Sequence, residues 1–72
     1  MKDKNPKDKA GITPLHLAAE NGYDYICHLI LKEVEIKNPE DGKGRTPLQL
    51  AAKNGYNDVC KTFKNYCIYL KP

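Results

Sequence analysis

The stretch GITPLHLAA at residues 11–19 decides the fold, because it returns 33 positions later as GRTPLQLAA at residues 44–52. The same spacing relates NPKD at 5–8 to NPED at 38–41, and NGY at 21–23 to NGY at 54–56. A fixed period of this size is typical of stacked supersecondary units, none of which buries its apolar face alone. Such arrays mostly bind other macromolecules through one extended face. The chain is therefore predicted to contain two stacked units.

Each copy of this stretch carries a helix-start signal. Thr13 offers a side-chain oxygen to the amides of the first turn, and Pro14 at the first helical position needs no hydrogen bond of its own. In the second copy Gln49 follows Thr46 by three residues and completes a capping box. His16 holds that place in the first copy, where its ring can meet the Thr13 hydroxyl.

The NG pairs end these helices, since glycine accepts the left-handed conformation that follows a helix end. We therefore expect short helices over residues 14–21 and 47–54. A second helix is expected after each, capped by Asp24 in the first copy and by Asn57 or Asp58 in the second. Its apolar stripe is predicted to comprise Ile26, Cys27, Leu29 and Ile30. Pro and Gly between residues 34 and 44 then mark a turn-rich link to the next unit.

These features predict an all-α solenoid of two stacked helix-turn-helix units joined by a β-hairpin-like loop, with antiparallel helices in each unit. The period and the TPLHLAA and TPLQLAA patterns followed by NG resemble the ankyrin repeats, and the resemblance covers nearly the whole chain. The sequence departs from the family pattern after the second helix of each unit. There the first copy reads VEIKN at 34–38 and keeps only the Asn, and CIYLK at 67–71 keeps none of the pattern.

The repeat frame divides the chain into three parts. Residues 1–7 are expected to form a frayed half-hairpin that would follow a preceding unit, residues 8–40 form the first repeat and residues 41–72 the second. Thr62 and Lys64 stand where the first copy has Leu29 and Leu31, and a polar outer face is typical of a capping repeat. The last helix is expected to extend to about Leu70. Because two repeats are few for stability, we expect either a longer array or self-association through exposed repeat faces.

Composition limits the function classes. The chain has 72 residues, 40% of them hydrophobic and 29% charged, and its longest apolar run is far too short to cross a bilayer. A net charge of +3 without a lysine and arginine cluster fits solubility better than nucleic-acid binding. Three cysteines cannot form a closed disulfide set, so we expect reduced thiols and an intracellular protein, cytoplasmic or nuclear.

No pattern for catalysis or for a cofactor is found. The sequence has no phosphate-binding glycine loop, no CxxC motif and no nucleophile with a plausible base. His16 and His28 are replaced by Gln49 and Lys61 in the second copy, which argues against a metal or catalytic role repeated in each unit. Tyr23 and Tyr56 repeat at the inter-helix turn, where packing over the turn explains them better than base stacking. A non-enzymatic protein without metal or cofactor is expected.

The resemblance to ankyrin repeats implies protein binding through the hairpin tips and the concave face of the first helices. Carried over by position, the candidate residues are Lys9, Ala10, Ile12, Gly42, Lys43 and Arg45 at the tips, and Glu20, Asn21, Lys53 and Asn54 on the helices. Most of these positions differ between the two copies. Either drift or selection for specificity explains these differences. Their positive charge favours an acidic protein segment as partner. A nucleic-acid-binding module and a structural spacer without a ligand are the alternatives.

Overall fold

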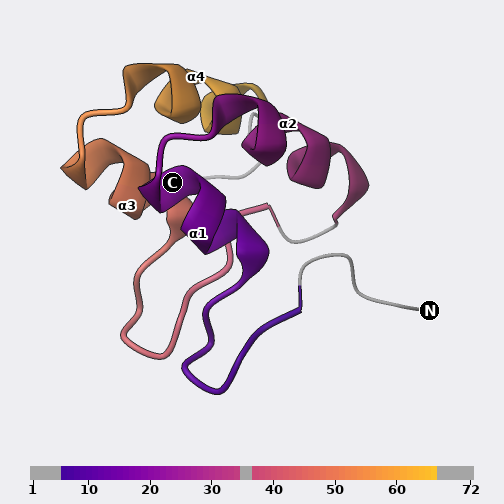
Figure 1. Ribbon diagram of the computed structural model, residues 1–72, viewed down its shortest axis with the longest axis vertical. Helices are drawn as coiled ribbons and strands as arrows, with labels where there is room; N and C mark the ends of the chain where they lie inside the picture. Colours follow the sequence, from indigo (N-terminus) through magenta and orange to yellow (C-terminus); the bar gives the residue numbers. More distant parts are fainter. Residues whose placement is uncertain (1–5, 35–36, 67–72) are drawn as a thin grey trace.

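The part of the chain that the structure describes folds into four helices (Figure 1). The computed structural model describes residues 6–34 and 37–66. The helices are α1 (Pro14–Glu20), α2 (Asp24–Glu33), α3 (Pro47–Lys53) and α4 (Asn57–Tyr66), and within the described ranges there is no strand. The predicted all-α class is therefore confirmed, and the two predicted first helices are present, each one residue shorter at its C-terminal end than expected.

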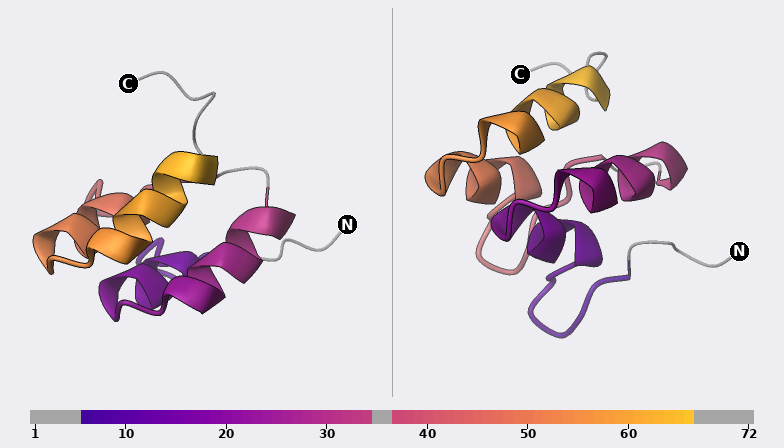
Figure 2. Two further views of the ribbon diagram at one scale, coloured as in Figure 1. Left: turned by 90° about the horizontal axis from the view of Figure 1, so that it is seen from above. Right: turned by 45° about the horizontal axis from the view of Figure 1, so that its top comes forward.

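The helices form two layers, each with one helix from each unit. α1 packs beside α3 in one layer and α2 beside α4 in the other, while α1 and α2, like α3 and α4, contact each other within a unit. Figure 2 shows this arrangement from two further directions. The loops that precede α1 and α3 project from the same side of the molecule (Figure 1). The unit is thus repeated by a sideways translation, which places equivalent residues of the two copies side by side.

Capping boxes begin both first helices, as the sequence predicts for the second copy and permits for the first. The Thr13 hydroxyl accepts from the His16 amide at 3.2 Å, and the Thr13 amide donates to Nδ1 of His16 at 3.1 Å. In the second copy the side chain of Gln49 accepts from the Thr46 amide at 3.2 Å. The NG turn then follows α1, with Gly22 at a φ of +75°.

The predicted cap of α2 is wrong. Tyr23 occupies the N-cap position without a side-chain hydrogen bond, and Asp24 is the first helical residue. The Asp24 carboxylate instead accepts a hydrogen bond from the Thr62 hydroxyl of the second unit. The Asp24 carboxylate, which the local sequence predicts to cap α2, is therefore used in an interaction between the two units. Asn57, one of the two caps considered for the copy, is likewise the first residue of α4.

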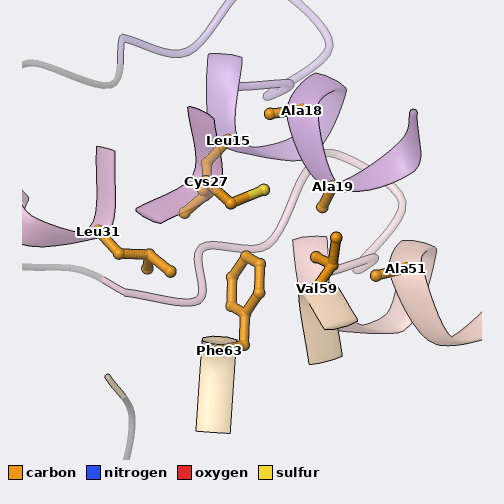
Figure 3. Close-up of a cluster of buried hydrophobic side chains, with 8 residues drawn as sticks. All are labelled: Leu15, Ala18, Ala19, Cys27, Leu31, Ala51, Val59 and Phe63. Atoms are coloured by element: carbon orange, nitrogen blue, oxygen red, sulfur yellow. The ribbon is translucent and has the colours of Figure 1, made fainter. Parts of the chain in front are cut away.

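The core lies between the two layers and is shared by both units (Figure 3). Its central side chain is Phe63, which is fully buried and whose burial stabilises the fold by about 1.5–3 kcal/mol. Ala18 and Ala19 are also buried and allow neighbouring helices to approach closely, as predicted. The buried cluster comprises Leu15, Ala18, Ala19, Cys27, Leu31, Ala51, Val59 and Phe63.

The predicted apolar stripe of α2 is only half correct. Cys27 is buried and Ile30 partly buried, but Ile26 and Leu29 are exposed, and Leu31 takes their place in the core. The reason is that α2 packs mainly against α1 and α4, so the side of α2 turned away from α4 has no neighbouring helix among the described residues to cover it.

The ends of the chain test the predicted boundaries only in part. Pro6 and Lys7 are exposed, and the rest of the expected half-hairpin lies outside the described residues. α4 is described to Tyr66, whose ring packs at the edge of the core and against His28, with ring centroids 5.2 Å apart. The expected continuation of this helix to Leu70 lies outside the described residues. Lys64 is exposed, whereas Thr62 faces the first unit, and the capping role of the second repeat stays a prediction.

Candidate partner-binding surface

The two tips, defined as residues 8–12 and 41–45, are copies of one loop closed by an aspartate. Oδ1 of Asp8 accepts from the amides of Ala10 and Ile12 at 2.9 and 2.8 Å. Oδ1 of Asp41 accepts from the amides of Lys43 and Arg45 at 2.8 and 2.9 Å. Because these contacts use backbone amides, they do not depend on the side chains at residues 9, 10 and 43.

Two hydrogen bonds hold the second tip against the first unit. The Gly42 amide donates to the Ala10 carbonyl at 2.7 Å. Nε2 of His16 lies 2.8 Å from the Arg45 carbonyl oxygen. Since Nδ1 of His16 accepts from the Thr13 amide, and the Arg45 carbonyl can only accept, Nε2 carries a proton and donates to Arg45. The tips of both units therefore form one continuous surface.

Arg45 is held within the second tip. Its Nε donates to Oδ2 of Asp41 at 2.8 Å, and 41% of the Arg45 side chain remains exposed against 1% of Asp41. Burial on its own raises the pKa of Asp41, but the amides of Arg45 and Lys43 and the guanidinium outweigh it and lower this pKa from 3.8 to about 2. Asp41 is therefore an ionised anchor, and Arg45 is already paired before any partner arrives.

The other tip candidates differ in exposure. Lys9, Ala10 and Lys43 are exposed, and Ile12 is half-buried. Gly42 is also exposed, although a Cβ at this position would lie 2.9 Å from the Ala10 carbonyl oxygen. Glycine at 42 is therefore required by the neighbouring backbone, so this difference between the copies follows from packing.

The helix candidates all lie exposed at the C-terminal ends of α1 and α3. Nδ2 of Asn54 donates to the Glu20 carbonyl at 3.0 Å and links the two units, while Nδ2 of Asn21 donates to Leu17 in its own helix at 2.8 Å. Both asparagines thus have structural roles. The side chains of Glu20 and Lys53 are exposed and carry opposite charges.

Sequence reasoning missed several exposed residues of the first helices. Leu17 is 52% exposed, and Gln49 and Ala52 are also exposed. Leu17 is identical to Leu50 in the copy, so a comparison of the two copies does not distinguish it. The signal that would identify Leu17 is its place on an exposed face of the first helix beside the buried face, and not a difference between the two copies.

Among the described residues, Cys27, Cys60 and His28 form no reactive arrangement. Cys27 and Cys60 are free thiols, and burial together with the charge of Asp24 raises the pKa of Cys27 to about 12, so its nucleophilic thiolate is scarce. His28 is exposed, as predicted, and lies within 3.2 Å of the Tyr66 hydroxyl. In the described part of the chain, no helix has the length and apolar character needed to cross a membrane.

Comparisons with known proteins place these features in a family. A sequence model of ankyrin repeats, which describes three copies, matches residues 1–70. Comparison with curated proteins and with solved structures found no match. Ankyrin repeats are generally non-catalytic protein-interaction modules. The internal period accounts for two of the three copies in that model, and the match spans nearly the entire sequence. The chain belongs to the ankyrin-repeat family.

Proposed function

We propose that this chain is a non-catalytic module that binds a protein partner through the two tips and the exposed face of α1 and α3. The observation that carries the proposal is the pair of hydrogen bonds from Gly42 to Ala10 and from His16 to Arg45, since they hold both tips in one surface before binding. A preformed surface binds without the cost of ordering loops. Membership of the ankyrin family supports the same function.

Charge favours an acidic segment as the partner. Lys9, Lys43 and Lys53 are exposed, and within residues 6–34 and 37–66 none of the three makes an ion pair. Arg45 contributes less, because Asp41 already neutralises its guanidinium. Rim charges of this kind mainly raise the association rate and make binding sensitive to salt. The free positive charge of the surface therefore comes from the three lysines, against the single carboxylate of Glu20 on the helices.

A labelled oligo-glutamate peptide tests this proposal through fluorescence anisotropy at low salt. The variant carries Lys9→Glu, Lys43→Glu and Lys53→Glu. Its matched control carries Lys32→Glu, Lys61→Glu and Lys64→Glu, three exposed lysines of the α2 and α4 layer with the same change in net charge. We expect the first triple variant to lose binding and the control to retain most of it. Equal losses in both would show that net charge alone attracts the peptide, and absence of binding by the wild type would remove the acidic partner.

A single-stranded oligonucleotide in the same assay separates protein binding from nucleic-acid binding. Tighter capture of the oligonucleotide, with a steep dependence of affinity on salt, would reassign the lysine surface to nucleic acid.

Two further points belong to the proposal. The free thiols of Cys27 and Cys60 support an intracellular location, cytoplasmic or nuclear. The exposed apolar side chains of the first unit support association through a repeat face.

A further inference from the structure

The first unit exposes the apolar surface that the second unit buries. Leu17 is 52% exposed, whereas its equivalent Leu50 is 6% exposed. Ile26 is 44% exposed, whereas its equivalent Val59 is 1% exposed. The residues of the second unit are covered because the first unit lies against them. The N-side face, defined as Leu17, Tyr23, Ile26 and Leu29, is the same surface one period earlier.

Contacts between the two units show the same difference between equivalent residues. A Cβ at Gly22 would lie 3.0 Å from the Tyr56 ring, so this tyrosine packs over the turn of the preceding unit rather than over its own. Among the described residues, its equivalent Tyr23 has no turn of a preceding unit to cover, and it is 55% exposed. Asn54 donates to the Glu20 carbonyl across the interface, whereas its equivalent Asn21 donates within its own helix. Neither of these two contacts of the second unit has a counterpart at the equivalent residue of the first unit.

The opposite side of the stack differs in chemistry. Leu31 of the first unit is fully buried against the second, but its equivalent Lys64 is exposed on the outer side. Lys61 likewise replaces His28, which contacts Tyr66 of the second unit. Covering this side with another unit would remove two ammonium groups from water, which is costly without a paired charge. The stack is therefore apolar on one side and charged on the other.

We propose that the N-side face is an interface for one further ankyrin unit, which precedes the first unit and stacks on it as the first stacks on the second. Continuity with the existing interface defines this occupant. It presents a leucine where the first unit has Leu31 and small side chains where the first unit has Ala18 and Ala19. A second copy of the chain stacked head to tail is disfavoured, because it would place Lys64 where that leucine is needed. The proposal is independent of what the tips bind.

Two extended chains of equal length test the direction of stacking. In the N-extended chain, a copy of residues 6–38 is inserted before Pro6, which aligns with Pro39 in the repeat frame. In the C-extended chain, a copy of residues 40–72 is added after Pro72, which aligns with the same proline. We expect the urea midpoint of the N-extended chain to lie above those of the original and C-extended chains. An N-extended chain that unfolds at or below the midpoint of the C-extended chain would overturn the proposal.

Substitutions at the proposed interface test whether the gain in the urea midpoint arises there. Ile26→Ala removes exposed methylene groups in the original chain, so its midpoint should shift little. In the N-extended chain the same change should shift the midpoint as much as Val59→Ala does, because both side chains are then buried between units. Equal shifts from Ile26→Ala in the two chains would contradict the proposed interface. Sedimentation of the original chain tests the remaining outcome. A dimer that Ile26→Lys dissociates would assign the N-side face to a second copy of the chain and would overturn the proposal of a preceding unit.

Discussion

Nε2 of His16 lies 2.8 Å from the carbonyl oxygen of Arg45, so one ring joins the helix cap of the first unit to the tip of the second. On its other edge the ring accepts the Thr13 amide at 3.1 Å, and the whole side chain is buried. Both nitrogens therefore have a partner, which removes the cost of burying a polar ring. The second copy has Gln49 at this position, exposed, with only the capping half of the interaction.

Replacing His16 separates its two roles. His16→Gln should retain the capping box, as Gln49 does, and lose the bond to Arg45, which costs about 0.5–1.5 kcal/mol of unfolding free energy. His16→Ala loses both interactions and leaves a cavity, so we expect about 2–4 kcal/mol. Urea denaturation measures both values. Gln49→Ala, which removes only an exposed cap partner, is the control and should cost least. Equal costs for His16→Gln and His16→Ala would show that the cap contributes nothing.

Acid should weaken the fold through Asp41. Its pKa is about 2 in the folded protein against an ordinary value of 3.8, so the unfolded chain binds the proton more readily. The stabilisation is present above pH 3.8 and is lost as the pH falls toward 2. Asp41→Asn should remove this part of the pH dependence, measured as urea midpoints across that range. Asp58→Asn, an exposed site on α4, is the control. Parallel pH profiles for the wild type and Asp41→Asn would contradict the assignment.

Alkylation should distinguish two cysteines at the same repeat position. Cys27 is buried with a pKa of about 12, whereas Cys60 is partly exposed. Iodoacetamide at neutral pH should therefore modify Cys60 first, because Cys27 reacts only when the structure opens. Peptide mass spectrometry follows both sites, and denaturing urea should abolish the difference. Faster modification of Cys27 in the native protein would show that the core around it is open.

Gly11 and Gly44 form a matched pair in the two tips. Both have a positive φ, +78° and +76°, so alanine at either costs about 1–2 kcal/mol from the left-handed backbone. A Cβ at Gly11 would lie 2.7 Å from the Gly42 nitrogen, while nothing lies within 4 Å at Gly44. Gly11→Ala should therefore destabilise the protein more than Gly44→Ala, as thermal unfolding would show. Equal losses would mean that the first tip moves away from the second without cost.

The local signals of this sequence are strong, and the parts of the fold that depend on them were predictable. Thr13 and Pro14 begin a helix wherever they occur in such a pattern, and the NG turn ends it. Ile26 shows the limit, because the pattern identifies it as apolar but does not say which neighbour covers it. Asp24 and Thr62 show the same limit for polar groups, since their hydrogen bond spans the two units. The pairing of Arg45 with Asp41 is a further contact that charge counting could not find.

In the aspartate-closed tips, the residues that fix the loop backbone are not the residues that present side chains to a partner. Because Asp8 and Asp41 bind backbone amides, side chains at residues 9, 10 and 43 contribute no hydrogen bond to the loops that carry them. Evolution or a designer can therefore exchange those three side chains and leave the scaffold intact. Gly42 is the exception, since the Ala10 carbonyl leaves no room for a side chain there. One short repeat thus supplies a reusable frame on which new recognition is obtained by substitution alone.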